Sequence, residues 1–281
     1  MSAASSWLFV PGDSARKIER ALQGAAHALI FDWEDAVAPQ AKAAARTVTR
    51  DALSAVRVPR ERLWIRVNAL TTSFHADDIE ALPVGAIAGV VLPKACGVDD
   101  IRHVSASLDA IDPQASLKIC GIVTETAASV LALSEFRAPM PRLHAMMWGG
   151  EDLSADLGIA DNRANHGAYR APFLLARNLM LMAAAATQCL PIDTVVVNFK
   201  DHAALAAEAA EARADGFTAK AAIHPDQVAV INDVFASTPE ELEWARAVIE
   251  TMEHAQGGVA SMNGKMLDAP HLRLAKRMLA R

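Results

Sequence analysis

The sequence has few cysteines, few aromatic residues and no excess of basic charge. Three cysteines occur in 281 residues, an odd number without Cys-x-x-Cys spacing, which argues against a disulfide framework or a zinc site and favours a reducing cytoplasm. Aromatic residues make up 5% of the chain, so we expect a core of Ala, Leu, Val, Ile and Met. The formal net charge is −6, which leaves no electrostatic footprint for nucleic acid.

Signatures of export, membrane insertion and covalent catalysis are missing as well. Residues 1–6 show no positive region followed by an apolar stretch, so we expect no signal peptide. The longest weakly charged segment, residues 179–190, is too short to cross a bilayer. There is no Gly-x-Ser-x-Gly elbow, and no cysteine has an obvious paired base. We therefore expect a cytoplasmic protein that binds neither a membrane nor nucleic acid.

What the sequence does contain is an alternation of apolar runs with Ala-rich amphipathic segments. The runs predicted as strands are Trp7–Val10, Ala28–Phe31, Leu63–Val67, Gly89–Leu92, Lys118–Val123, His144–Trp148, Thr194–Val197 and Ala219–Ile223. The segments predicted as helices are Ala15–Leu22, Gln40–Ser54, Ala76–Leu82, Val98–Ala110, Ala127–Phe136, Phe173–Ala186, Ala203–Ala214 and Asp226–Phe235. This order predicts a parallel sheet covered by helices. An open doubly wound sheet would favour a glycine-rich phosphate loop after its first strand, which is absent, so we predict a (β/α)8 TIM barrel.

The pattern changes towards the C-terminus. Thr238-Pro239-Glu240-Glu241 has the form of a capped helix start, with Thr238 as N-cap. Gly257-Gly258 ends that helix, and Asn263-Gly264 predicts a turn before a final basic helix. We therefore predict a catalytic barrel domain over residues 1–237 and a C-terminal helix and lid segment over residues 238–281.

Polar residues follow the ends of six predicted strands, at the point where a barrel enzyme builds its active site. The segments are Asp32-Trp33-Glu34-Asp35, Arg66-Val67-Asn68, Leu92-Pro93-Lys94, Glu125-Thr126, Glu151-Asp152 and Ile223-His224-Pro225. Glu125 and Asp152 follow neighbouring strands, and two carboxylates with open water positions suit Mg²⁺ or Mn²⁺. Helix capping or ion pairing is the alternative role for either carboxylate.

A second acidic cluster consists of Asp32, Glu34 and Asp35. Three adjacent acids repel one another unless they meet a metal, a cation or a helix N-terminus, and Asp35 has helix capping as an alternative. The planar guanidinium of Arg66 suits a carboxylate or thioester oxygen, with neutralisation of the cluster as the alternative. Lys94 fits either role.

Gly149-Gly150 precedes Glu151 and lets backbone N–H groups approach an anionic ligand, although a tight turn would explain the glycines equally well. His224 stands before a proline at a helix start, where we expect a buried structural histidine more than a catalytic one. The predicted substrate-binding residues are Arg66, Lys94, Glu125, Gly149, Gly150 and Glu151.

Short motifs follow one another in a characteristic order along nearly the whole chain. They are Leu8-Phe9-Val10-Pro11-Gly12, Phe31-Asp32-Trp33-Glu34-Asp35-Ala36-Val37, Arg66-Val67-Asn68, Leu92-Pro93-Lys94, Glu125-Thr126-Ala127, Gly149-Gly150-Glu151-Asp152-Leu153, Ala176-Arg177, Gly216-Phe217-Thr218-Ala219-Lys220, Ile223-His224-Pro225-Asp226-Gln227 and Asn263-Gly264-Lys265-Met266-Leu267-Asp268-Ala269-Pro270. This order resembles the citrate lyase β-subunit-like family of the HpcH/HpaI aldolase superfamily. The pattern is most similar to that of citramalyl-CoA and malyl-CoA lyases.

The resemblance implies a barrel that is usually trimeric, with Mg²⁺ at Glu125 and Asp152 and with Arg66 on the substrate. It also implies that Glu34 and Asp35 line the catalytic site. The acid at Asp268 is implied to come from the C-terminal lid, often in the active site of a neighbouring subunit, and to act on an acetyl enolate.

The activity implied is a reversible Claisen-type cleavage of a short 3-hydroxyacyl-CoA thioester into acetyl-CoA and a 2-oxo acid, with CoA as part of the substrate. Ser5, Asn198 and Ala219 stand where the family usually has Arg, an acid and Gly, so the particular substrate stays open. The alternatives are the citryl-ACP lyase β subunit of a citrate lyase complex, a malate-synthase-like or thioesterase enzyme, and a regulatory subunit without activity.

Overall fold

The computed structural model describes residues 4–55, 57–164, 167–255 and 258–279. Gly257, part of the expected tether before the lid segment, lies outside the described residues. Contacts divide the chain into a barrel unit, Ala4–Val234, and a smaller unit that begins at Phe235.

Eight parallel strands form a closed barrel in sequence order. They are β1 (Ser6–Pro11), β2 (Ala28–Asp32), β3 (Leu63–Arg66), β4 (Gly89–Leu92), β5 (Lys118–Ile122), β6 (Leu143–Met147), β7 (Leu190–Asp193) and β8 (Ala219–Ala222). The barrel closes where Ser6 of β1 pairs with Lys220 of β8. The predicted TIM barrel is confirmed.

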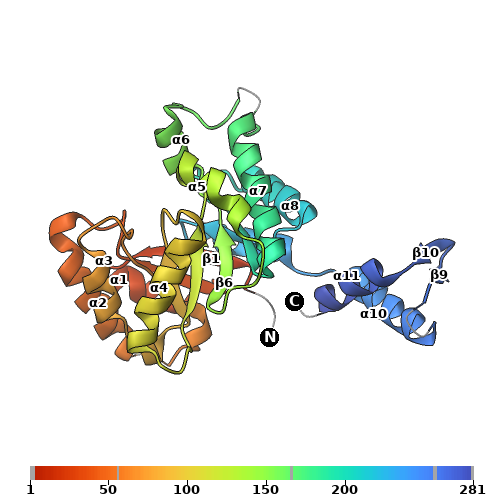
Figure 1. Cartoon of the computed structure of the whole chain (residues 1–281), viewed down its shortest axis with the longest axis horizontal. Helices are drawn as coiled ribbons and strands as arrows, with labels where there is room; N and C mark the ends of the chain where they lie inside the picture. Colours follow the sequence, from red (N-terminus) through yellow and green to blue (C-terminus); the bar gives the residue numbers. More distant parts are fainter. Residues whose placement is uncertain (1–3, 56, 165–166, 256–257, 280–281) are drawn as a thin grey trace. The chain divides into compact units, whose positions relative to one another are not determined.

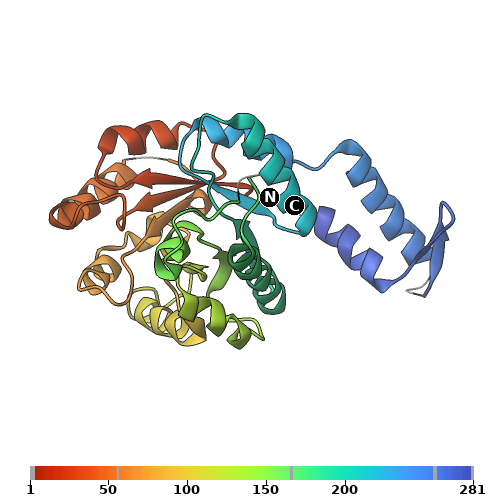
Figure 2. The same cartoon turned by 90° about the horizontal axis from the view of Figure 1, so that it is seen from above.

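The helices of the barrel unit lie outside the strands, as Figures 1 and 2 show. They are α1 (Ala15–Leu22), α2 (Lys42–Ser54), α3 (His75–Ala81), α4 (Gly97–Ile111), α5 (Ala127–Ala132), α6 (Glu151–Leu157), α7 (Ala171–Thr187), α8 (His202–Asp215) and α9 (Asp226–Phe235). No helix in the described part of the chain is long and apolar enough to cross a membrane.

The few aromatic residues are concentrated in the core. Trp7, Trp33 and Trp148 are each at most 1% exposed. Inside the barrel, Trp7 packs on Trp64 with ring centroids 4.9 Å apart, among alanines such as Ala28. Small residues opposite large ones fill the barrel interior, and this pairing explains how an Ala-rich chain builds a dense core.

The seventh strand was predicted in the wrong place. Its predicted range, Thr194–Val197, is β-branched, but the observed β7 lies four residues earlier, at Leu190–Asp193. Val197 is 56% exposed, so local β-propensity was overridden by the packing of β7 between β6 and β8. A short helix, α6, also forms at Glu151–Leu157, where we predicted none.

The smaller unit is a helical hairpin with its own apolar cluster. It consists of α10 (Pro239–His254), β9 (Ala260–Met262), β10 (Lys265–Leu267) and α11 (Ala269–Leu279). The predicted cap of α10 is confirmed, because Thr238 and Glu241 form a capping box. Asn263 and Gly264 both have positive φ and form the tight turn between β9 and β10.

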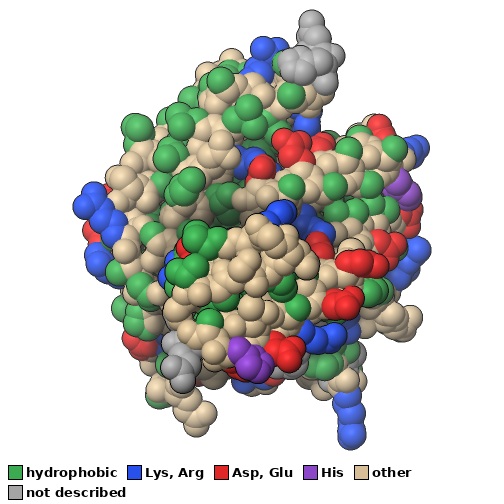
Figure 3. All heavy atoms as spheres, turned by 90° about the vertical axis from the view of Figure 1, so that its right-hand side faces the viewer, with side chains coloured by type: hydrophobic (Ala, Val, Ile, Leu, Met, Phe, Trp, Pro, Cys, Tyr) green, Lys and Arg blue, Asp and Glu red, His purple; other side chains and the backbone are tan. Residues whose placement is uncertain are grey.

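Charge of one sign does not gather on the face drawn in Figure 3. Lys and Arg side chains are interspersed there with Asp and Glu, as far as the described residues show.

Candidate active site

A cavity of about 370 Å³ opens at the carboxyl ends of the strands. The charged residues of its lining are Asp32, Asp35, Arg66, Glu125, Glu151 and Asp152. All six come from segments in which the sequence places polar residues directly after strands. The closed barrel brings them together because every parallel strand ends at the same mouth.

Arg66 is held by the acidic cluster that follows β2. Its Nε and Nη2 atoms donate to the two oxygens of Asp32, at 2.7 and 2.5 Å. Its Nη1 lies 2.9 Å from Oε2 of Glu34. Burial opposes the charge of Arg66, but the carboxylates of Asp32, Glu34 and Asp35 together outweigh that effect and raise the pKa of Arg66. Arg66 therefore neutralises the acidic cluster, and it also lines the cavity.

The acids after β2 have separate tasks. Asp32 accepts the backbone N–H groups of Glu34 and Ala36, at 2.8 and 3.1 Å, and so fixes this turn. The expected alternative that Asp35 caps a helix is wrong, because the following 3-10 helix has Ala38 as N-cap without a side-chain bond. Asp35 lines the cavity with a side chain that is 57% exposed, whereas the buried Glu34 is not among the residues that line it.

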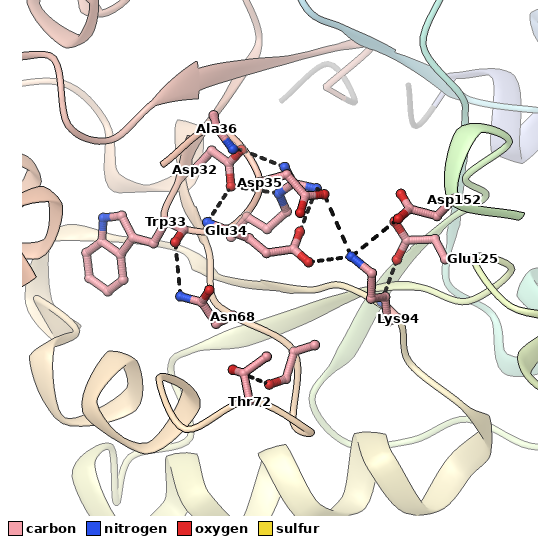
Figure 4. A network of polar contacts seen from close by, with 12 residues as sticks. Asp32, Trp33, Glu34, Asp35, Ala36, Asn68, Thr72, Lys94, Glu125 and Asp152 are labelled. Carbon is pink, nitrogen blue, oxygen red and sulfur yellow. Dashed lines mark hydrogen bonds and ion pairs between the residues drawn. The ribbon is translucent and has the colours of Figure 1, made fainter. Parts of the chain in front are cut away.

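Lys94 connects the two acidic groups, as Figure 4 shows. Its Nζ lies 2.6 Å from Oε1 of Glu34 and 3.4 Å from Oδ1 of Asp152. Lys94 has a positive φ of 52°, a strained backbone for a residue that is not glycine. This backbone turn lets its N–H group donate to Glu125 while its ammonium reaches Glu34.

Glu125 is 3% exposed and sits next to the Asp152 carboxylate. Burial raises the pKa of Glu125 to about 8, and the carboxylates of Asp152 and Glu34 add to this effect. A Cβ on Gly149 would lie 2.8 Å from Cγ of Glu125, so glycine is required for this approach. A buried carboxylate beside a second carboxylate has a strong electrostatic reason to accept a cation.

The donor set fits a hard divalent cation that keeps several waters. Neither carboxylate is an N-cap, because Thr126 caps α5 and Gly150 precedes α6. Among the described residues no group of three or more His, Cys, Asp or Glu side chains forms a metal cage. Two carboxylates with open positions suit Mg²⁺ better than Zn²⁺, which prefers nitrogen or sulfur.

One expectation about a backbone contact and one about burial need correction. The N–H group of Gly149 donates to Oγ1 of Thr124 at 2.9 Å and is not directed at a ligand. Glu151 lines the cavity in the first turn of α6, and its Oε1 accepts from Nδ2 of Asn162, so its role in substrate binding stays a prediction. The side chain of His224 is 38% exposed and stacks on Phe199, so the expectation of a buried histidine is wrong.

A second cavity, of about 400 Å³, adjoins the first and shares Phe9, Val10, Pro11 and Ile223 with it. Its basic lining consists of Arg16, Lys17 and Arg20 on α1, together with His224. The sequence reasoning missed this group. The available signal was the spacing of Arg16 and Arg20, which places two cations four residues apart on one helix face.

A buried ionic network behind Trp148 was also missed. Nζ of Lys220 lies 2.5 Å from Oδ2 of Asp193, and Trp148 donates from Nε1 to Oδ1 of Asp193 at 2.7 Å. Arg177 lies 3.4 Å from the same Asp193 oxygen. Because the seventh strand was predicted at Thr194–Val197, Asp193 was not recognised as a residue at a strand end. Its position at the end of β7 follows only from the observed register.

Asp268 belongs to the smaller unit, directly after β10, and its role in the barrel site stays a prediction. Its side chain is 35% exposed. The resemblance alone assigned it to catalysis.

Comparisons with known proteins agree with this geometry. A family model described as HpcH/HpaI aldolase/citrate lyase matches residues 5–225. A citrate lyase subunit beta-like protein of Mycobacterium tuberculosis is 36% identical over 280 residues, covering 100% of this chain and 96% of the relative. A (3S)-malyl-CoA thioesterase of Cereibacter sphaeroides is 33% identical, covering 98% of this chain and 93% of the relative.

A solved structure has the same fold. The crystal structure of CitE from M. tuberculosis in complex with magnesium, acetoacetate and coenzyme A matches with a TM-score of 0.78 at 35% identity, covering 100% of this chain and 98% of that chain. The family suggested by the motifs is confirmed. The chain belongs to the HpcH/HpaI aldolase/citrate lyase family and is therefore a member of a family of enzymes.

Proposed function

We propose that this protein is a Mg²⁺-dependent carbon–carbon lyase that cleaves a short 3-hydroxyacyl-CoA thioester of the citramalyl-CoA or malyl-CoA type. The products are acetyl-CoA and a 2-oxo acid, pyruvate or glyoxylate respectively. The observation that carries the proposal is the placement of Glu125, Asp152 and Arg66 around one cavity that adjoins a basic cavity.

The sizes of the two cavities support a substrate whose acyl part occupies the first cavity and whose CoA part extends towards the second. A cavity of about 370 Å³ is at the small end of ligand sites and suits the acyl part of a thioester. The remainder of CoA, with its phosphates, then lies towards Arg16 and Arg20. The solved CitE structure contains magnesium, acetoacetate and coenzyme A together, which supports the same pairing of ligands here.

Each charged residue of the first cavity has a chemical task in this proposal. When bound at Glu125 and Asp152, Mg²⁺ supplies Lewis-acid polarisation of the hydroxyl and carboxylate oxygens of the substrate. Arg66 donates to substrate oxygens and offsets the negative charge that develops as the C–C bond breaks. Asp32 and Glu34 keep the guanidinium in place, and Lys94 bridges Glu34 and Asp152.

The test is a product assay on purified protein with Mg²⁺ and a panel of 3-hydroxydicarboxylyl-CoA thioesters, read by mass spectrometry. We expect equal amounts of acetyl-CoA and one 2-oxo acid. A panel without cleavage of any C–C bond would overturn the proposal.

Thioester hydrolysis is a second candidate, favoured by the 33% identical (3S)-malyl-CoA thioesterase. The same assay separates the two reactions, because hydrolysis releases free CoA and leaves the dicarboxylic acid intact. The panel should include a citryl-ACP substrate, since citrate lyase subunit beta of Escherichia coli is 31% identical.

Arg66→Lys should lower kcat/KM on the order of 10²-fold, because ammonium lacks the planar fork that grips two oxygens. Steady-state kinetics of the lyase reaction will measure the loss, with the melting temperature as a check on folding. A value within about twofold of the parent would restrict Arg66 to its ion pairs with the acidic cluster.

The double variant Arg16→Ala, Arg20→Ala should raise the KM for the CoA thioester about tenfold and leave kcat unchanged. Two exposed cation–phosphate contacts are each worth roughly 0.7 kcal/mol, which together give that factor. The increase should shrink at high ionic strength. Arg50→Ala, an exposed arginine on α2, is the matched control, and an equal KM effect there would refute a phosphate site on α1.

Mg²⁺ affinity should weaken as the pH falls below 8. The pKa of Glu125 is raised to about 8, so Glu125 is mostly neutral at pH 7 and Mg²⁺ must displace its proton. We expect affinity to fall about tenfold between pH 9 and pH 7, with about one proton released per Mg²⁺ in calorimetry at pH 7. Affinity that is constant from pH 6.5 to 9 would contradict a neutral Glu125.

A further inference from the structure

Trp148 is held at the wall of the first cavity by a buried carboxylate. The residue directly follows β6, lines the cavity and is itself buried. Its Nε1 donates to Oδ1 of Asp193 at 2.7 Å. By comparison, the indole of Trp7 donates to a backbone carbonyl and that of Trp33 to a hydroxyl. The indole of Trp148 therefore has a carboxylate as its acceptor, and a bond to an ionised acceptor is stronger than a bond between neutral groups.

Two cations hold Asp193 in its ionised form. Nζ of Lys220 lies 2.5 Å from Oδ2 of Asp193, and Nε of Arg177 lies 3.4 Å from Oδ1. Burial opposes the charge of Asp193, but the two cations and the hydrogen bonds from Lys220 and Trp148 outweigh that effect and lower the pKa of the carboxyl. Arg177 and Lys220 belong to two of the ordered sequence motifs, yet they line neither cavity. Their link to the cavity is therefore Asp193 and its bond to Trp148.

This ionic network lies in the layer between the barrel and its helices. Ile192 and Ala219 belong to the apolar cluster inside the barrel, so Asp193 and Lys220, the next residues along β7 and β8, point outwards. The two residues are also register partners on these strands. Apolar side chains of similar volume commonly fill such a layer without loss of stability, because desolvation offsets the attraction of a buried ion pair. What the carboxylate adds is a directed bond that fixes the rotation of the indole.

The indole of Trp148 packs against the turn that leads to Asp152. A Cβ on Gly150 would lie 3.2 Å from Cζ3 of Trp148 and 3.5 Å from Nδ2 of Asn162. Tyr169 meets the indole edge-on, with ring centroids 5.0 Å apart. Gly150 is the N-cap of α6, and Asp152 lies in the first turn of that helix. A rotation of the indole would therefore displace the backbone that carries Asp152.

We propose that Asp193 is a positioning residue for the metal site. Held by Lys220 and Arg177, its carboxylate fixes the indole of Trp148. The indole in turn fixes the backbone that presents Asp152 to Mg²⁺. This inference rests on the proposed function, in which Asp152 is a metal ligand. Residues that orient metal ligands from outside the coordination sphere typically contribute about 10- to 100-fold to metal affinity or activity.

A pair of matched variants tests this role in the protein without substrate. Asp193→Asn should weaken Mg²⁺ binding about tenfold in calorimetry, because a neutral amide holds the indole less firmly. The control is Asp112→Asn, which removes another buried carboxylate, ion-paired with Arg142 ahead of β5 at the opposite end of the barrel. The control should keep the parental Mg²⁺ affinity. Equal losses in the two variants would reduce Asp193 to a stabilising residue and overturn the positioning role.

A double-mutant cycle tests the route through the indole. Trp148→Phe removes the N–H donor and should by itself weaken Mg²⁺ binding about tenfold. In that background Asp193→Asn should change the affinity by no more than about twofold, because residues that act through one contact are not additive. Losses that multiply would refute the route. If Asp193→Asn does not fold, Trp148→Phe still decides, since an unchanged Mg²⁺ affinity in that variant would overturn the proposal.

A spectroscopic measurement checks the contact itself. The indole ¹H–¹⁵N signal of Trp148, assigned by its loss in Trp148→Phe, should move in Asp193→Asn while the signal of Trp33 stays in place; an unchanged signal would contradict the proposal. An active wild type whose Mg²⁺ affinity survives both Asp193→Asn and Trp148→Phe would overturn this inference alone. A wild type that binds Mg²⁺, shows both losses and yet cleaves no thioester would overturn the proposed function alone.

Discussion

Replacement of Glu125 by Gln is expected to remove Mg²⁺ binding and to lower kcat on the order of 10³-fold or more. The amide keeps the shape of the buried side chain but cannot supply a negatively charged oxygen to the cation. Folding should be retained, because Glu125 is 3% exposed and its burial already favours the neutral form. Calorimetric Mg²⁺ titration, the melting temperature and lyase kinetics measure the three effects.

A second ligand variant, a control variant and removal of the metal check this prediction. Asp152→Asn should also lose Mg²⁺ affinity, because it removes the second carboxylate, and it should release Lys94 from one ion pair. Glu211→Gln changes an exposed glutamate on α8 and should leave binding and turnover unchanged. Full turnover in excess chelator, after verified removal of metal, would show that Glu125 and Asp152 serve the reaction without a cation.

Replacement of Asp268 by Ala is expected to lower cleavage by 10²- to 10⁴-fold, the usual contribution of a general acid. Binding of Mg²⁺ and of the 2-oxo acid should persist, because Glu125, Asp152 and Arg66 are untouched. Product analysis by mass spectrometry and binding calorimetry will separate the two effects. Glu253→Ala, an exposed acid on α10 of the same unit, is the matched control.

A mixing experiment extends this prediction. Chains with Asp268→Ala and chains with Glu125→Ala are each expected to be inactive, and combining them should restore partial activity, since the family resemblance places the lid acid in a neighbouring subunit. Absence of rescue in verified mixed oligomers would assign each Asp268 to its own barrel. An active Asp268→Ala enzyme would remove this acid from the mechanism.

Most of the fold could be predicted because the alternation of apolar strands and amphipathic helices is a local property of the chain. The eight-strand barrel, the capped start of α10 and the turn at Asn263-Gly264 all follow from short sequence patterns. The seventh strand could not be placed in this way. Thr194–Val197 has strong β-propensity, but hydrogen bonding to β6 and β8 selected Leu190–Asp193.

In the candidate site, too, some features could be predicted from the sequence and others only from the tertiary structure. Position after a strand sufficed to nominate Arg66, Glu125 and Asp152, because the carboxyl ends of parallel strands converge whatever the details of packing. Which side chains form ion pairs with one another depends on their distances in the folded structure. Only the tertiary structure decided that Asp32 grips Arg66 and that Lys94 bridges Glu34 and Asp152.

The raised pKa of Glu125 likewise arises from the packing around it. Residue type and spacing carry no information on desolvation, which burial at the barrel mouth and the close approach of Gly149 create. Residue identity and strand order therefore specify which groups reach the site, whereas the folded geometry sets their charge and their partners.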